Sequence, residues 1–160
     1  MSIQLTGADI VDLAVQTETR GEAFYRQAAQ EATWPEAQKL FTYLADQEVR
    51  HKQIFQGLGG AIVMTEVSPE TWEEALGYIQ ATVDRAFFAK EDAPIRAVPR
   101  GATVPEMLKQ AIAFEKETLL FFYGVLDLVQ PANKHLVEQI IAEEKSHVRQ
   151  LAAMLAQAKA

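Results

Sequence analysis

Hydrophobic and polar positions recur along most of the chain in steps of three and four residues. This spacing places the apolar side chains on one face of an α-helix. No segment shows the period-two alternation of a half-buried strand, so the pattern predicts an all-α protein. The predicted helices are four long ones and a shorter one in the middle, over residues 6–32, 35–58, 68–88, 104–130 and 131–158.

Proline, glycine and hydroxyl residues separate these segments. Thr6 and Thr103 stand before apolar runs, where a side-chain oxygen can cap a helix. Pro35 and Pro131 are suited to the first turn of the helices that they begin. Residues 90–103 hold two prolines and a glycine, which favours a loop before the fourth helix.

The apolar face of each long helix is interrupted at one level by an acidic residue. In two of the helices the glutamate is followed three residues later by a histidine, so both side chains lie on one face. Apart from this level, the faces are apolar or small. The residues that interrupt them are Glu18, Glu48, His51, Glu115, Glu144 and His147.

The interruptions repeat along the chain. Glu18 and Glu115 are separated by 115 − 18 = 97 residues. Glu48 and Glu144 are separated by 144 − 48 = 96 residues, and the same offset relates the two histidines. The chain therefore resembles two helical hairpins of one design. We expect one domain over residues 1–160, with hairpin one at about 6–58, a crossover containing the short helix at about 59–103, and hairpin two at about 104–158.

The motifs of each hairpin also lie at one height. The first turn falls near residue 33, about 15 residues after Glu18 and 15 to 17 before Glu48 and His51. At 1.5 Å rise per residue, both arms place these groups roughly 23 Å from the turn. The second hairpin gives the same result around residue 130. A bundle of the two hairpins would then hold four carboxylates and two imidazoles in one layer.

Such a layer needs positive charge. Each buried carboxylate costs several kcal/mol, and neighbouring carboxylates repel one another. No lysine or arginine occupies the apolar faces to balance them. Two divalent cations would supply +4 against −4, with both imidazoles neutral and donating nitrogen lone pairs. A glutamate from each of two helices and Glu-x-x-His from the other two is the ligand pattern of di-iron and di-manganese carboxylate bundles.

These motifs resemble the rubrerythrin-like branch of the ferritin-like superfamily, and the resemblance covers essentially the whole chain. It rests on Glu18 seven residues before Tyr25, on QEVRH at 47–51, on FEKETLLFFY at 114–123 and on EEKSH at 143–147. The resemblance implies a ferritin-like four-helix bundle around a carboxylate-bridged di-iron centre. It implies bridging roles for Glu48 and Glu144, terminal roles for Glu18 and Glu115, and one metal each for His51 and His147.

Two departures from the family pattern affect the expected chemistry. Full rubrerythrins carry a cysteine-ligated rubredoxin domain as electron donor, whereas this sequence has no cysteine. They also carry a further glutamate one turn after the third-helix ligand, where this chain has Thr118. Both departures favour a simpler ferroxidase-type centre over a rubrerythrin peroxidase cycle.

The predicted function is a di-iron oxidoreductase that oxidises Fe(II) with O2 or H2O2, with an electron donor that the residues do not identify. The alternative is a non-catalytic protein that binds two metal ions or delivers iron. Glutamate and histidine also suit Mn and Zn. An oxygenase acting on an organic substrate ranks last, because Leu44, Leu119 and Phe122 are expected to fill the space beside the metals.

The composition and the net charge limit the partners and the cellular location that we expect. The net charge of −7 argues against nucleic acid and anionic membranes as partners. The longest apolar run, residues 119–126, is too short to span a bilayer, and residues 1–13 lack the features of a signal peptide. We therefore expect a cytoplasmic protein. The long connection between the hairpins suggests a homodimer.

Several residues near the motifs have an ordinary structural interpretation. We interpret Tyr25 as a core residue with a satisfied hydroxyl; the alternatives are a hydrogen bond to the site and a redox relay. Glu22 and Glu143 flank the apolar faces and are interpreted as exposed; the alternatives are replacement of a named ligand and support of an imidazole. His135 is expected at the surface. The short helix has its own apolar stripe, which would pack on the bundle or on a second subunit: Trp72, Leu76, Ile79 and Val83.

Overall fold

The computed structural model describes residues 5–62, 67–86 and 96–158. Within these ranges the chain forms an all-α bundle, as the apolar periodicity predicts. The α-helices are α1 (Gly7–Glu31), α2 (Pro35–Gly57), α3 (Pro69–Ala86), α4 (Val104–Leu128) and α5 (Lys134–Gln157). A 3-10 turn, η2 (Pro131–Asn133), precedes α5. The last helix therefore begins three residues later than predicted, because the chain completes this tighter turn first.

The helix starts follow from their capping residues. Thr6 caps α1: its hydroxyl accepts from the backbone N–H of Asp9 at 3.3 Å, and the Asp9 carboxylate accepts from the N–H of Thr6 at 2.7 Å. Thr103 and Glu106 form the same reciprocal pair at the start of α4. Such capping boxes satisfy N–H groups that have no partner inside the helix, so these boundaries were predictable from the sequence.

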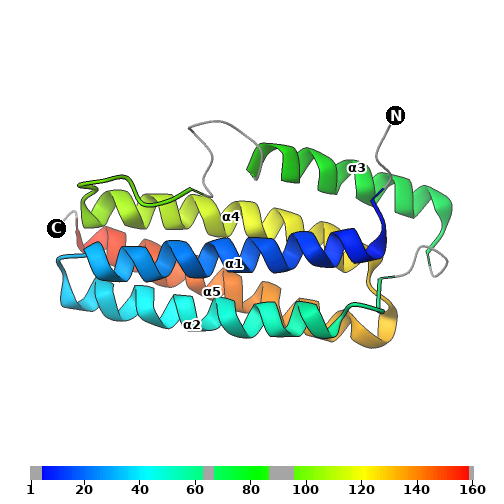
Figure 1. Cartoon of the computed structure of the whole chain (residues 1–160), viewed down its shortest axis with the longest axis horizontal. Coiled ribbons are helices and arrows are strands. Elements are labelled where there is room, and N and C mark those ends of the chain that lie inside the picture. Colours follow the sequence, from blue (N-terminus) through cyan, green and yellow to red (C-terminus); the bar gives the residue numbers. More distant parts are fainter. Residues whose placement is uncertain (1–4, 63–66, 87–95, 159–160) are drawn as a thin grey trace.

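Four helices form two antiparallel hairpins, α1 with α2 and α4 with α5, and α3 lies outside the bundle along α4 (Figure 1). Trp72, Leu76 and Ile79 are buried on α3, so this stripe packs on the bundle. Gly124 permits the close approach, since a Cβ at this position would lie 2.8 Å from the ring of Tyr78. The side chain of Val83 and residues 87–95, which include the predicted end of the third helix, lie outside the described part.

The apolar interior is divided into two clusters along the bundle axis. One cluster includes Phe55 and Phe122, and the other includes Phe41 and Phe114. In every long helix, the predicted glutamate or Glu-x-x-His motif lies between the segments that feed the two clusters. The polar layer is therefore enclosed by hydrophobic packing above and below.

No strand forms in the described ranges; a single isolated bridge joins Ile62 to Val129. Over the same ranges, no helix combines the length and the apolar character needed to cross a membrane.

Candidate metal centre

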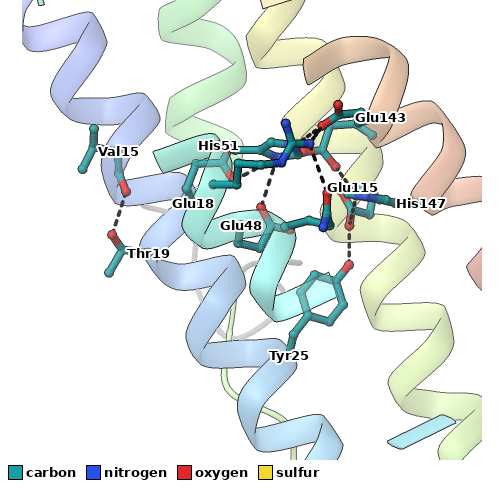
Figure 2. Close-up of polar contacts among 12 residues, drawn as sticks. Val15, Glu18, Thr19, Tyr25, Glu48, His51, Glu115, Glu143 and His147 are labelled. Atoms are coloured by element: carbon teal, nitrogen blue, oxygen red, sulfur yellow. Dashed lines mark hydrogen bonds and ion pairs between the residues drawn. The ribbon is translucent and has the colours of Figure 1, made fainter. Parts of the chain in front are cut away.

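All four bundle helices contribute to one polar layer. The side chains that point into it come from α1 (Glu18), α2 (Glu48, His51), α4 (Glu115) and α5 (Glu144, His147). Figure 2 shows these groups converging from separate ribbons onto one small volume. Each of them is at most 1% exposed. The structure thus brings together every residue that the repeat pattern singles out.

A glycine allows α1 to approach this layer. Gly21 lies one turn after Glu18, and a Cβ built on it would fall 2.7 Å from the ring of Phe114 and 3.2 Å from the carboxyl carbon of Glu48. Real Cβ atoms almost never approach another atom as closely as the Phe114 contact. Any side chain at position 21 would therefore displace the phenyl ring that supports the layer.

The six residues divide into two overlapping groups of four. In each group, one ligand atom per residue can be chosen so that all of them lie within 4.8 Å of one another. Glu48 and Glu144 belong to both groups, so they are placed where a carboxylate could bridge two ions. We call the groups the His51 position and the His147 position; they comprise Glu18, Glu48, His51 and Glu144, and Glu48, Glu115, Glu144 and His147.

Both imidazoles turn the same nitrogen toward the carboxylates. Nδ1 of His51 lies 2.7 Å from Oε1 of Glu144, and Nδ1 of His147 lies 2.8 Å from Oε2 of the same residue. The two oxygens of Glu144 therefore face different histidines. The rings lie nearly parallel, with centroids 5.8 Å apart. In this orientation each Nε2 is directed away from the candidate metal positions.

Several buried oxygens in the layer have no hydrogen bond. Both carboxylate oxygens of Glu18 and of Glu48 lack a partner, and so does Oε2 of Glu115. A buried carboxylate oxygen without a partner is costly, and such atoms are rare in folded proteins. Oxygen and imidazole donors gathered within bonding reach of one point satisfy divalent transition metals, so this donor set fits two metal ions.

Without cations, protons would have to relieve the repulsion. Burial and the nearby charge of Glu48 raise the pKa of Glu18 well above its ordinary value. Burial and the charge of Glu144 raise the pKa of Glu115 in the same way. The carboxyl groups of Glu18 and Glu115 therefore favour the protonated form unless another positive charge enters the layer.

The pKa values of Glu144 and His51 shift so that both residues favour their charged forms, unlike Glu18 and Glu115. Burial lowers the pKa of His51, but its interactions with Glu144 and Glu48 outweigh this effect and raise the pKa to about 10. Burial raises the pKa of Glu144, yet interactions with His147 and His51 lower it overall. The protein groups alone thus form an internal ion pair, and a metal ion would replace the proton on the imidazole.

Tyr25 is more than a core aromatic. It is fully buried beside Phe24 and Phe41, and its hydroxyl donates a hydrogen bond to Oε1 of Glu115 (Figure 2). Burial and the charge of Glu115 raise the pKa of this phenol. The hydroxyl is satisfied, as expected, but the preferred structural interpretation missed that its acceptor is a carboxylate of the layer.

Glu143 was interpreted as exposed from the sequence, and the structure corrects this. Its side chain is 26% exposed, and its Oε2 lies 2.8 Å from Nε2 of His51 and forms an ion pair with Arg50. Its Oε1 accepts from Gln139 at 3.0 Å. Burial alone would raise the pKa of Glu143, but the bonds to His51 and Gln139 lower it.

Other flanking residues are more ordinary. Glu22 is half-buried rather than exposed as predicted, because it pairs with Lys52 at 3.1 Å and with Arg26 at 3.5 Å. His135 is exposed, as predicted. Thr118 is buried and its hydroxyl has no hydrogen bond. Arg50 was not anticipated, since it acts across helices and no spacing within α2 indicates its partner.

Comparison with known proteins identifies the family. The Rubrerythrin family profile matches residues 9–155. This chain belongs to the rubrerythrin family. A crystal structure of a Thermotoga maritima protein assigned to the ferritin-like diiron-carboxylate proteins superimposes with a TM-score of 0.69, at 27% identity, and the match covers 99% of each chain. Among curated proteins, no match is found.

The family, the similar structure and the buried glutamate–histidine cluster together support a di-iron carboxylate protein with a ferritin-like helical bundle. These 160 residues contain no cysteine, so they provide no cysteine-ligated iron site.

Proposed function

We propose that this protein holds two iron ions in the polar layer and oxidises Fe(II) with O2 or H2O2. Glu48 and Glu144 would bridge the ions, and Glu18 and Glu115 would bind one ion each. His51 and His147 would complete the two positions through Nδ1. The observation that carries the proposal is the pair of overlapping four-residue groups with two shared carboxylates.

Charge balance supports two dications. The layer holds four glutamates, and the raised pKa values of Glu18 and Glu115 reflect the cost of ionising all of them together. Two Fe(II) ions would neutralise four carboxylates and allow both imidazoles to be neutral donors. Binding should therefore release protons and stabilise the fold.

When bound by these residues, two Fe(II) ions would supply the two electrons needed to reduce one reactant molecule. With H2O2, two electrons and two protons cleave the O–O bond and give two molecules of water. With O2, the same two electrons and two protons give H2O2. The chain contributes fixed ligands and a surround from which bulk water is excluded, because Leu44 and Phe122 are fully buried.

The burial of the layer favours a small oxidant. None of the six side chains is more than 1% exposed, so a reactant must pass between packed helices. Molecules as small as O2 and H2O2 can do this through small fluctuations, whereas an organic substrate would need a cavity. The geometry therefore supports O2 or H2O2 over an oxygenase substrate.

The test is anaerobic loading with two equivalents of Fe(II), followed by rapid mixing with H2O2 or O2. We expect fast oxidation of two Fe(II) per chain, followed by the ultraviolet absorption of protein-bound Fe(III). Glu48→Ala should abolish the fast phase, whereas Glu22→Gln, which changes a carboxylate outside the layer, should leave it intact. Oxidation at the rate of free Fe(II) in the unsubstituted protein would overturn the proposal.

A metal-binding or iron-delivery role is the second candidate. It is favoured by the donor set, because glutamate and histidine do not select strongly among Fe, Mn and Zn. The absence of cysteine also means that this chain carries no thiolate-ligated electron donor of its own. Tight binding of two ions without repeated turnover of peroxide, even with an added reductant, would support this role over catalysis.

A homodimer in the cytoplasm remains a prediction from the sequence. Sedimentation velocity of the purified protein tests the oligomeric state, with a sedimenting mass near twice 17.8 kDa as the expected result.

A further inference from the structure

The two candidate metal positions differ in what supports their ligands. The repeat offset of 96 places Gln47 at the position equivalent to Glu143, since 143 − 96 = 47. A carboxylate in hairpin two thus corresponds to a neutral amide in hairpin one. The structure shows what each residue contacts, so the consequence for each histidine can be followed directly.

At the His51 position, the outward imidazole nitrogen has an anionic partner. Nε2 of His51 lies 2.8 Å from Oε2 of Glu143. The carboxylate of Glu143 is itself held on both oxygens, by Arg50 on Oε2 and by Gln139 on Oε1. When a metal ion displaces the Nδ1 proton of His51, Glu143 would hold the remaining proton on Nε2, so the lone pair of Nδ1 would be directed at the metal position beside Glu144.

At the His147 position, no such partner is present. Within the described residues, no hydrogen bond reaches Nε2 of His147. Gln47 instead accepts from Arg50 at 3.1 Å. The ring of His147 is flanked by Tyr43, whose ring lies edge-on with centroids 6.2 Å apart. An aromatic edge holds a ring in place but cannot orient its proton as a carboxylate does.

The carboxylates of Glu115 and Glu18 also differ in their hydrogen bonds. Glu115 receives a hydrogen bond from Tyr25, whereas neither oxygen of Glu18 has one. The residue equivalent to Tyr25 is Phe122, since 25 + 97 = 122, and Phe122 packs against Phe55 with ring centroids 4.7 Å apart. A hydroxyl that donates to a carboxylate reduces the electron density available for a metal ion.

The difference at the two histidines sets the expected order of affinity. A carboxylate bonded to the far nitrogen makes an imidazole a stronger and better-oriented ligand, and removal of such a partner typically costs about 10–100-fold in metal affinity. The His51 position has this support and an unencumbered Glu18. The His147 position lacks the support, and its Glu115 is shared with Tyr25.

We propose that Glu143 is a positioning residue that makes the His51 position the tighter of the two, so that divalent metal ions fill it first. This inference rests on the proposed dinuclear site but not on its oxidation chemistry. Loading would be stepwise: the first ion binds with Glu18 and His51, and the second binds with Glu115 and His147.

The probe is Co(II), added anaerobically to metal-depleted protein and followed by calorimetry and by proton NMR of the imidazole N–H resonances. Variants His51→Ala and His147→Ala assign the shifted signals. We expect two affinities that differ at least about tenfold. With one equivalent of Co(II), the shifted N–H signal should belong to His51 and should exchange slowly with water because Glu143 accepts it.

Substitutions at the two equivalent positions give a matched pair. Glu143→Gln retains an acceptor but loses the charge, so the first affinity should fall several-fold; Glu143→Ala should lower it about 10–100-fold and speed the exchange of the His51 proton. Glu143→Asp should restore part of the loss. Gln47→Glu should strengthen the weaker position instead. None of the Glu143 substitutions should alter the second affinity appreciably.

The outcomes separate this inference from the proposed function. Two ions of equal affinity, or a first ion whose shifted signal belongs to His147, would overturn the stepwise order and leave the dinuclear site standing. A normal first affinity in Glu143→Ala would overturn the role of Glu143. Failure of the unsubstituted protein to bind Co(II), Mn(II) or Fe(II) would instead remove the proposed function itself.

Discussion

The two helical hairpins carry the same ligand types at the same height but surround them differently. Hairpin α1–α2 contributes Glu18, Glu48 and His51, and hairpin α4–α5 contributes the same three kinds of side chain. Yet His51 of the first hairpin contacts Glu143 of the second, and Glu115 of the second accepts a hydrogen bond from Tyr25 of the first.

This comparison shows which features a repeated sequence reproduces. The ligands lie on the helices' own inward faces, so a repeated spacing places them in both halves. The outer contacts cross between hairpins and depend on single residues at matched positions, where a carboxylate replaces an amide and a phenol replaces a phenyl ring. A centre with symmetrical ligands therefore has two unequal halves.

The largest expected effect comes from removing a shared carboxylate. Glu144→Ala takes a ligand from both positions, so it should abolish tight binding of both ions. Glu18→Ala affects only the His51 position and should leave about one ion per chain. Metal content after gel filtration distinguishes the two variants. Equal loss in both would contradict the division into a shared and a terminal carboxylate.

Metal removal should change both the stability and its pH dependence. At a free metal concentration of 100 times Kd, each occupied position adds about 2.7 kcal/mol, so two positions add about 5 kcal/mol. Chelation should therefore lower Tm clearly. Differential scanning calorimetry with and without Mn(II) measures this difference, and an unchanged Tm would speak against metal in the layer.

The sign of the pH dependence follows from the raised pKa values. In metal-depleted protein, folded Glu18 and Glu115 retain protons above the ordinary value of 4.5, so their contribution to stability falls as pH rises beyond it. His51 acts in the same sense between 6.5 and about 10. Glu144, whose pKa is lowered, loses its contribution only below 4.5. Urea denaturation of the metal-depleted protein from pH 5 to 9 should show declining stability; an increase would contradict this balance.

A smaller effect is expected where α1 approaches the layer. Gly21→Ala introduces a Cβ 2.7 Å from the ring of Phe114, and such overpacking costs about 1–3 kcal/mol. Gly77→Ala on α3 is the matched control, because a Cβ there meets nothing within 4 Å. It should stabilise the helix by about 0.5–1 kcal/mol. Urea denaturation that ranks the two variants in the opposite order would contradict the packing at Gly21.

The smallest effect is expected from the phenol. Tyr25→Phe removes the hydrogen bond to Glu115 and should destabilise metal-depleted protein by about 1 kcal/mol. In metal-loaded protein it should strengthen the His147 position a few-fold, because Glu115 regains its full donor capacity. Co(II) titration measures this second change. A weaker His147 position would show that Tyr25 supports the ligand rather than competing with the metal.

Much of the fold was predictable because its signals are local. Thr6 and Thr103 fix helix starts through capping boxes that can be read from neighbouring residues, and helical periodicity identifies the buried faces. The six polar residues of the layer could be found because apolar faces rarely include a carboxylate, and because the pattern occurs twice. The start of α5 was missed because a proline can open either a 3-10 turn or an α-helix.

The outer contacts could not be predicted because they are set by the relative rotation of neighbouring helices. Glu143 precedes a ligand in the chain, and its spacing alone suits an exposed side chain. Only the packing of α5 against α2 brings it to Nε2 of His51 and to Arg50. Tyr25 likewise has the pattern of any core aromatic, and its acceptor lies 90 residues away.

The central claim is that two cations balance the buried carboxylates. Its most direct test is anomalous X-ray diffraction from crystals grown anaerobically with Fe(II), measured on both sides of the iron absorption edge. The account predicts two iron peaks, each beside the Nδ1 of one histidine, with Glu48 and Glu144 contacting both. Crystals that contain iron elsewhere but show no iron peak among these six side chains would contradict it.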